Sequence, residues 1–239
     1  MSRQVVLVHG AWHGAWCWDR LLPHLDKADV EAVAIDLPGH GEDPGPLGDL
    51  HADSGRVTEV LDRSDGGVLL VGHSYGGAVI TEAGVHPAVE HLLYLAAFPL
   101  DEGETCMTAA AQIAEAAGID HAGRPDLSGA LQDRGDGNLI IEPAAAAATL
   151  YNTCDEETVA WAVARLGPQP AVTLAQEASA VAWRTKASTY AICTEDLIVH
   201  PDFQRIVAGR CTSSVEWATD HSPFLCRPDL VARLISDLV

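Results

Sequence analysis

Six consecutive residues combine a nucleophile with glycines at a spacing that suits catalysis. They are Gly72-His73-Ser74-Tyr75-Gly76-Gly77, and they lie between the apolar run 68–71 and a helical pattern over 78–83. A serine flanked by glycines in a strand-to-helix turn fits a nucleophile elbow, in which the tight turn exposes the hydroxyl at the end of a sheet. The sequence therefore predicts Ser74 as a catalytic nucleophile.

A serine hydroxyl is a weak nucleophile and needs a base. Among the histidines downstream of Ser74, His221 is best placed, because it follows the last strand pattern, 214–217, and precedes the final helix. His200 is the alternative, but it stands beside Pro201 at the start of a helix. His86, His91 and His121 are expected on the surface or in a cap over the site.

The acid that orients the base is expected at the end of the strand pattern 189–193, where Asp196 is preferred and Glu195 is the nearest alternative. Asp220 adjoins His221, and neighbouring side chains rarely reach the geometry that the pair requires. Asp101 follows the earlier strand 92–98 and is a second topological option. It is interpreted instead as the hinge into the segment that follows.

The developing oxyanion needs preorganised hydrogen-bond donors. One is expected to be the backbone amide of Tyr75, the residue after the nucleophile. The other is expected in the loop that follows the first strand, where Gly10 allows the backbone to come close to the nucleophile. The Ala11 amide is the preferred donor there, and the Trp12 amide is the alternative.

Short apolar runs alternate with helical patterns on both sides of a long interruption. Strands are expected at 4–8, 32–37, 68–71, 92–98, 189–193 and 214–217, with helices at 21–25, 57–61, 78–83, 203–207 and 230–238. Such alternation predicts an α/β protein with a mainly parallel sheet flanked by helices. Residues 101–184 are Ala-rich with no good strand, so we expect a small helical cap inserted between core segments 1–100 and 185–239.

Composition narrows the classes of partner and cofactor. The 239 residues carry a formal net charge of −20, which disfavours nucleic acid and anionic membranes as partners. No apolar run approaches the ~20 residues of a membrane span. The six cysteines are scattered, without paired metal-ligand spacing, so we expect reduced thiols and neither a metal nor another cofactor. Residues 1–4 run directly into a strand pattern instead of a signal sequence, which favours the cytoplasm.

Motifs along nearly the whole chain resemble those of the plant methylesterase and hydroxynitrile lyase family and its bacterial relatives. They are His9-Gly10-Ala11-Trp12-His13-Gly14-Ala15-Trp16-Cys17-Trp18, Asp36-Leu37-Pro38-Gly39-His40-Gly41, Gly72 to Gly77, Leu95-Ala96-Ala97-Phe98, Tyr151-Asn152-Thr153-Cys154, Glu195-Asp196 with Phe203-Gln204, and His221-Ser222-Pro223. The resemblance implies the α/β-hydrolase fold, the triad Ser74, Asp196 and His221, and the amides of Ala11 and Tyr75.

The resemblance also implies small, largely apolar substrates. The candidate pocket walls are Gly10, Trp12, Phe98, Tyr151, Trp161 and Leu197, although ordinary core packing explains each of the bulky ones equally well. The oligomeric state is not fixed by the resemblance, and a homodimer is one of the states that it allows.

The leading functional hypothesis is a carboxylic ester hydrolase. The alternatives on this scaffold are a hydroxynitrile lyase, a biosynthetic cyclase, decarboxylase or thioesterase, and a ligand receptor with slow turnover. The lyases of the family place a threonine after the first histidine of the N-terminal motif and a lysine after the catalytic histidine. Here these positions are Gly10 and Ser222, which favours the esterases.

Overall fold

A computed structural model describes residues 4–120, 122, 124–125 and 130–239. Six strands form one sheet in the order β2-β1-β3-β4-β8-β9, and every neighbouring pair in it is parallel. The strands are β1 (Val5–Val8), β2 (Ala32–Ile35), β3 (Val68–His73), β4 (Val89–Leu95), β8 (Ala187–Cys193) and β9 (Ser213–Trp217). These are the six strands that the sequence predicts, and the α/β-hydrolase fold with its mainly parallel sheet is confirmed.

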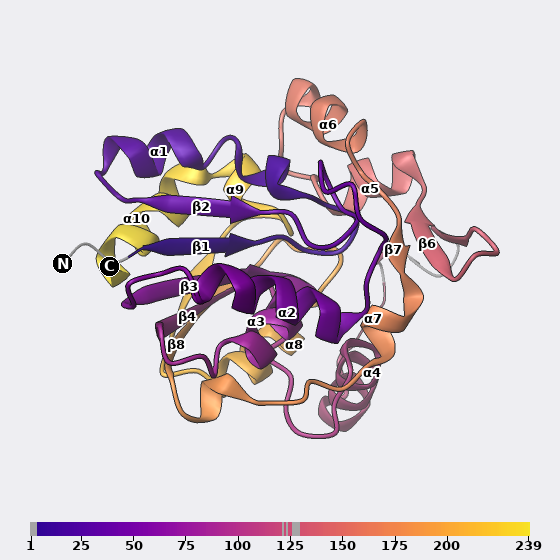
Figure 1. The fold of residues 1–239 in the computed structure, drawn as a ribbon. Coiled ribbons are helices and arrows are strands. Elements are labelled where there is room, and N and C mark those ends of the chain that lie inside the picture. Colours follow the sequence, from indigo (N-terminus) through magenta and orange to yellow (C-terminus); the bar gives the residue numbers. More distant parts are fainter. Residues whose placement is uncertain (1–3, 121, 123, 126–129) are drawn as a thin grey trace.

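Helices cover both faces of this sheet (Figure 1). Helices α1 (Leu22–Lys27) and α10 (Pro228–Leu238) pack together on one face, whereas α2 (Leu50–Leu61) and α3 (Gly76–Ala83) pack together on the other. Helix α8 (Pro201–Ala208) packs against β8, and the short α9 (Pro223–Cys226) packs against α10 and a 3-10 turn, η1 (Ala15–Trp18). Strands β1 and β3 are buried along their full length, as expected of parallel strands covered on both faces.

Most of the chain between β4 and β8 gathers at the carboxyl ends of the strands, and its last part runs back to the amino end of β8 (Figure 1). Its elements are α4 (Cys106–Ala117), β5 (Leu131–Asp133), β6 (Asn138–Ile141), α5 (Pro143–Thr149), α6 (Glu156–Val163), β7 (Gln169–Pro170), α7 (Ala171–Ala175) and the 3-10 turn η2 (Ala182–Arg184). His121, expected on the surface or in the cap, lies outside the described residues.

The expectation that 101–184 contains no strand is wrong. Strands β5, β6 and β7 form a separate antiparallel sheet of three strands, none of which joins the main sheet. The three strands have only three, four and two residues, too few for a periodic pattern to stand out. The turn between β5 and β6 is the part of this sheet that the sequence does indicate. Gly135 and Gly137 flank Asp136 there, and both glycines have the positive φ that favours glycine in hairpin turns.

The two ends of this inserted segment are fastened to each other. The indole N–H of Trp183 donates to the Leu100 carbonyl at 2.8 Å, and Asp101 forms an ion pair with Arg184. Asp101 is thereby engaged at the hinge, as the sequence suggested, and not at the histidine.

The strand order places the predicted chemistry at one point. The chain runs from β1 outward to β2 and then returns to the opposite side of β1 as β3, so the connections diverge between β1 and β3. Ligands of open α/β sheets bind at such a switch point, beyond the carboxyl ends of the strands. The loop of Ala11 follows β1, and the turn of Ser74 follows β3.

Candidate active site

Ser74 occupies a strained turn between β3 and α3. Its φ is 51°, in the left-handed region that a residue with a side chain rarely adopts. The turn is crowded: a Cβ atom on Gly72 would lie 2.6 Å from the Gly76 carbonyl oxygen, and one on Gly76 would lie 2.5 Å from that of His9. Both glycines are therefore required by sterics, and the strain is held by the surrounding sheet and helix.

His221 and Asp196 form a buried pair. Asp196 Oδ2 lies 2.7 Å from His221 Nδ1, and both side chains are almost fully excluded from solvent. The other donors to the Asp196 carboxylate are the backbone amides of Ile198 and Val199 on Oδ1 and the Gln204 side-chain amide on Oδ2. These three donors suit a carboxylate, which accepts hydrogen bonds and donates none. A carboxylate here accepts from His221 Nδ1–H, and His221 Nε2 is then the nitrogen with a free lone pair.

His73 holds His221 against the turn of Ser74. Its Nε2 lies 2.8 Å from the backbone carbonyl oxygen of His221, and the two imidazole rings are 4.7 Å apart. A carbonyl only accepts, so His73 Nε2 carries the proton. Burial lowers the pKa of His73 well below its usual value, and the ring stays neutral at physiological pH.

Two backbone amides near Ser74, those of Tyr75 and Ala11, follow peptide carbonyls that are held by hydrogen bonds. The Ser74 carbonyl accepts from the amides of Gly77 at 2.9 Å and Phe98 at 3.2 Å, which fixes the peptide whose N–H belongs to Tyr75. The Gly10 carbonyl accepts from His9 Nδ1 at 2.8 Å, which fixes the peptide whose N–H belongs to Ala11. Within the described part of the chain, neither of these N–H groups donates to a protein acceptor.

The loop of Ala11 touches the turn of Ser74. A Cβ atom on Gly10 would lie 3.0 Å from Ser74 Cβ and 2.7 Å from His73 Nδ1, so this position admits no side chain. The Trp12 amide donates to Gln169 Oε1 at 3.2 Å and is already engaged. Ala11 and not Trp12 is thus the available donor.

His13 secures the same loop from the other side. Its Nδ1 bonds the Ala11 carbonyl at 2.7 Å, and its Nε2 accepts from the Tyr151 hydroxyl at 2.8 Å. Burial lowers the pKa of His13 to about 4, so the neutral ring that this arrangement requires persists at neutral pH. Tyr151, expected as a pocket wall, packs fully buried against His13.

The other expected pocket residues divide between the site and its surroundings. Phe98 is half-buried and lines an apolar cavity of about 120 Å³ beside the loop that carries Asp196. Leu197 is half-buried next to Asp196. Trp161 lies instead on α6, stacked edge-on against Trp16 and covered by the Arg165 guanidinium. The cavity is lined by Phe98, Ala110, Ala114, Ile119, Ile198, Val199, His200 and Phe203.

The rival catalytic residues have other surroundings. Glu195 is exposed, and its backbone carbonyl accepts from the Asn152 side chain. The His200 ring caps α8, where its Nδ1 accepts from the Asp202 amide at 3.1 Å. Asp220 is buried but points away from the His221 ring, toward Thr153, Cys154 and Cys226.

Sequence reasoning assigned no role to several residues that position this site. His73 orients His221, Gln204 binds the Asp196 carboxylate, and Gln169 of β7 holds the Trp12 amide. Gln204 stood in a family motif, but its role was not apparent. His73 is the variable second position of the elbow, and Gln169 lies in a strand too short to recognise.

Asp53 is a further residue that the sequence did not single out. It lies on α2, is fully excluded from solvent, and accepts from the Tyr75 hydroxyl at 2.5 Å through Oδ2. Its Oδ1 has no partner among the described residues. Burial, with a smaller contribution from the neighbouring Asp49, raises the pKa of Asp53 from 3.8 to about 7, against the opposing effect of the Tyr75 hydrogen bond.

This burial gives the protein a pH-dependent stability that the Asp53→Asn variant lacks. Between the unfolded pKa and about pH 7 the folded state holds a proton that the unfolded state has released, so the free energy of unfolding falls as pH rises. The contribution of Asp53 is expected to drop by about 3 kcal/mol from pH 5 to pH 8. Urea unfolding of both proteins at the two pH values measures it.

The exposed Asp26→Asn variant is the matched control and should keep the parent pH dependence. Equal pH dependence in Asp53→Asn and the parent protein would show that Asp53 is ionised in the fold already at pH 5.

Comparisons with known proteins agree with this architecture. Residues 5–234 match the model of the alpha/beta hydrolase family, and the chain belongs to that family. It is 30% identical over 247 residues to alpha/beta hydrolase nvfD of Aspergillus novofumigatus (strain IBT 16806), covering 97% of this chain and 94% of the relative. It is 28% identical to methyl jasmonate esterase 1 of Vitis vinifera, covering 98% of this chain and 95% of that protein.

The solved structure of a polyneuridine aldehyde esterase variant shares the fold, with a TM-score of 0.84 and 22% identity, over 100% of this chain and 99% of that one. The resemblance to plant methylesterases is confirmed at the level of the alpha/beta hydrolase family and its fold. Among the described residues, no helix is long and apolar enough to cross a membrane.

Proposed function

We propose that this protein is a serine hydrolase that cleaves a small, largely apolar carboxylic ester through an acyl-enzyme. One observation carries the proposal. The buried Asp196–His221 pair lies beside a strained serine turn flanked by two unengaged amides, because His73, the neighbour of Ser74, binds the His221 carbonyl. The named esterase among its relatives favours an ester as the substrate.

The residues divide the reaction between them. Ser74 Oγ attacks the ester carbonyl while His221 Nε2 takes the hydroxyl proton, and the amides of Ala11 and Tyr75 hold the oxyanion. The tetrahedral intermediate then collapses to the acyl-enzyme, and His221 returns the proton to the departing alcohol. Water, deprotonated by His221, attacks the acyl carbonyl and releases the acid with regeneration of Ser74. This sequence of steps needs no cofactor.

We propose that the apolar cavity beside Phe98 receives part of a small substrate. It measures about 120 Å³, below the usual range of ~300–1,000 Å³ for ligand pockets, and it adjoins the Asp196 loop without being lined by Ser74 or His221. Its walls come from the Asp196 loop and from α4 of the inserted segment, so the insert is proposed to limit substrate size as a cap. A series of p-nitrophenyl esters of increasing acyl length should show turnover falling steeply beyond short chains.

The structure also favours hydrolysis over cyanohydrin cleavage. Gly10 has no room for a side chain, so the threonine of the lyase pattern cannot be accommodated here without displacing Ser74 or His73. Ser222 follows His221 and supplies no positive charge to a leaving cyanide. The chain has two lysines, and Lys186 Nζ bonds the carbonyls of His86 and Val89, at the end of the sheet opposite to Ser74. The other, Lys27, ends α1.

We therefore expect the pure enzyme to hydrolyse p-nitrophenyl acetate and to release no cyanide from mandelonitrile above the Ser74→Ala background. Both reactions are followed in parallel at equal enzyme concentration. Ser74-dependent cyanide release that outpaces ester cleavage would place the protein among the lyases.

A further inference from the structure

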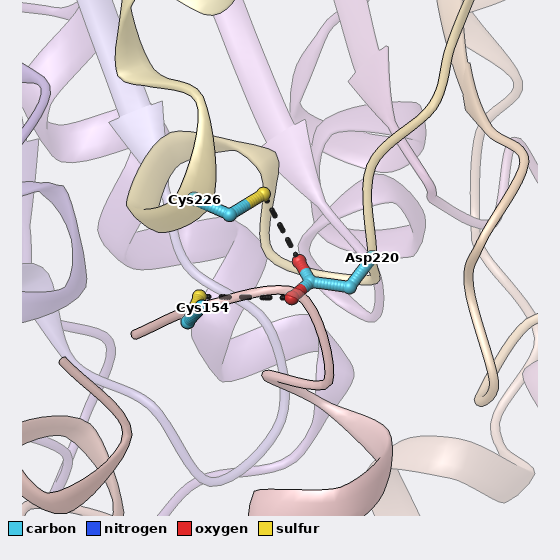
Figure 2. A group of neighbouring side chains, drawn as sticks. All are labelled: Cys154, Asp220 and Cys226. Atoms are coloured by element: carbon cyan, nitrogen blue, oxygen red, sulfur yellow. Dashed lines mark hydrogen bonds between the residues drawn. The ribbon is translucent and has the colours of Figure 1, made fainter. Parts of the chain in front are cut away.

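Outside the proposed catalytic site, two thiols converge on one buried carboxylate. Cys154 Sγ lies 3.6 Å from Asp220 Oδ2, and Cys226 Sγ lies 3.3 Å from Asp220 Oδ1. One ligand atom from each residue lies within 4.8 Å of the others. Figure 2 shows both thiols turned toward the carboxylate, Cys154 from the segment before α6 and Cys226 from the end of α9. We propose that these three side chains form a binding site for a thiophilic divalent cation such as Zn²⁺.

The spacing suits such an ion. With Zn–S near 2.3 Å and Zn–O near 2.0–2.2 Å, sulfur and oxygen ligands of a tetrahedral site are about 3.5 Å apart. Each thiol lies close to this distance from a different oxygen of the Asp220 carboxylate, and one ligand atom from each residue lies within 4.8 Å of the others. A ligand set of two cysteine thiolates and one carboxylate selects Zn²⁺ over Mg²⁺ or Ca²⁺, which take oxygen ligands.

The negative charge of the Asp220 carboxylate has no cationic partner among the described residues, and a bound cation would neutralise it. Asp220 is fully buried, and its partners are neutral: the two thiols and the backbone amides of Thr153 and Ser222, each at 2.9 Å. Among the described residues, no basic side chain forms an ion pair with it. Binding of Zn²⁺ displaces the two thiol protons to solvent, and the ion replaces two weak S–H donors with direct coordination.

The cluster is partly open to solvent. Cys154 and Cys226 are half-buried and not sealed, so an ion can reach them from solvent. Three protein ligands with one open position is an arrangement that Zn²⁺ commonly adopts. The amides that already bind Asp220 fix the carboxylate in place and reduce the reorganisation that binding requires.

The site links two parts of the fold. Cys154 belongs to the inserted segment, whereas Asp220 directly precedes His221 and Cys226 ends the helix that follows it. A bound ion would fasten the insert to the loop that carries His221. We expect the bound ion to reduce ester turnover by restricting the loop that carries His221. The bound metal itself is detected by its absorption spectrum.

Co²⁺ titration under a phosphine reductant tests the site directly. The parent protein is expected to bind one Co²⁺ with a thiolate-to-metal band in the near ultraviolet and the visible bands of a tetrahedral ion. Zn²⁺ should displace it stoichiometrically. Cys154→Ser and Cys226→Ser should each lose the thiolate band or weaken binding at least tenfold, while the half-buried Cys211→Ser should bind as the parent does.

Circular dichroism establishes that each serine variant is folded before titration. Absence of the thiolate band in the parent protein, or its persistence in the Cys154→Ser, Cys226→Ser double variant, would overturn the proposal. Zn²⁺ inhibition of p-nitrophenyl acetate cleavage that disappears in Cys154→Ser supports the link to the active site. A fully Zn²⁺-loaded enzyme with unchanged turnover would refute that link.

Discussion

A purified Ser74→Ala variant is expected to fold like the parent protein and to hydrolyse esters about 10⁶-fold more slowly. The loss is large because, among the described residues, no other hydroxyl follows a strand of the main sheet in such a turn beside two unengaged amides. Stability should change little. The hydroxyl of Ser74 has no hydrogen-bond partner among the described residues, so its removal leaves no buried group unpaired.

Ser222→Ala is the matched control. Ser222 is a fully buried serine in the loop of His221, and its hydroxyl likewise has no partner in the described part of the chain. Its variant should keep parent turnover, which separates loss of the nucleophile from general disturbance of the loop. Turnover of p-nitrophenyl acetate and thermal unfolding are measured for both. A folded Ser74→Ala enzyme that retains more than about a tenth of parent activity would exclude Ser74 as the nucleophile.

The main sheet could be predicted because its strands are continuous apolar runs. Burial on both faces leaves little freedom in composition, and runs such as 68–71 and 189–193 stand out from the polar loops between them. The position of each catalytic candidate directly after a strand then followed from topology, since parallel strands bring their carboxyl ends to one edge. This is why Ser74, Asp196 and His221 could be paired across more than a hundred residues of intervening chain.

Residues outside that logic were not predictable. The approach of Cys154 to Cys226 depends on how the inserted segment settles on the α9 loop, and neither cysteine has a sequence neighbour that signals it. Asp53 occupies a helix whose charged residues suggested a polar face, yet it is turned inward to the Tyr75 hydroxyl. Such side chains are placed by packing between elements, about which the periodicity of one element says nothing.

The supporting hydrogen bonds also escape sequence patterns, although they explain how the proposed oxyanion donors are held. The Gly10 and Ser74 carbonyls are each tied down, and this leaves the next amide free in both loops. Trp12 and Ser74, which adjoin these amides, both have positive φ. Local strain at the two proposed donors is sustained by His9, His13 and the start of α3, which agrees with a site organised before substrate arrives.

Asp196→Asn is expected to leave a folded enzyme with turnover about 10⁴-fold lower. The structure explains why the asparagine must misdirect the histidine. Oδ1 accepts from two backbone amides, Ile198 and Val199, so the single oxygen of an asparagine has to occupy that position. The amide nitrogen then faces His221 Nδ1, which can only accept from it.

The imidazole proton is thereby driven to Nε2, where it abolishes the base that Ser74 needs. Gln204, which donates to the carboxylate at 2.9 Å, meets a second N–H group, so a moderate loss of stability should accompany the catalytic effect. Steady-state kinetics should show the loss in kcat with KM little changed, because the tautomer affects chemistry more than substrate binding. Glu195→Gln, at an exposed position, and Asp101→Asn, at the hinge ion pair, should each retain most of the parent turnover. A larger loss in either control than in Asp196→Asn would move the acid of the triad to that residue.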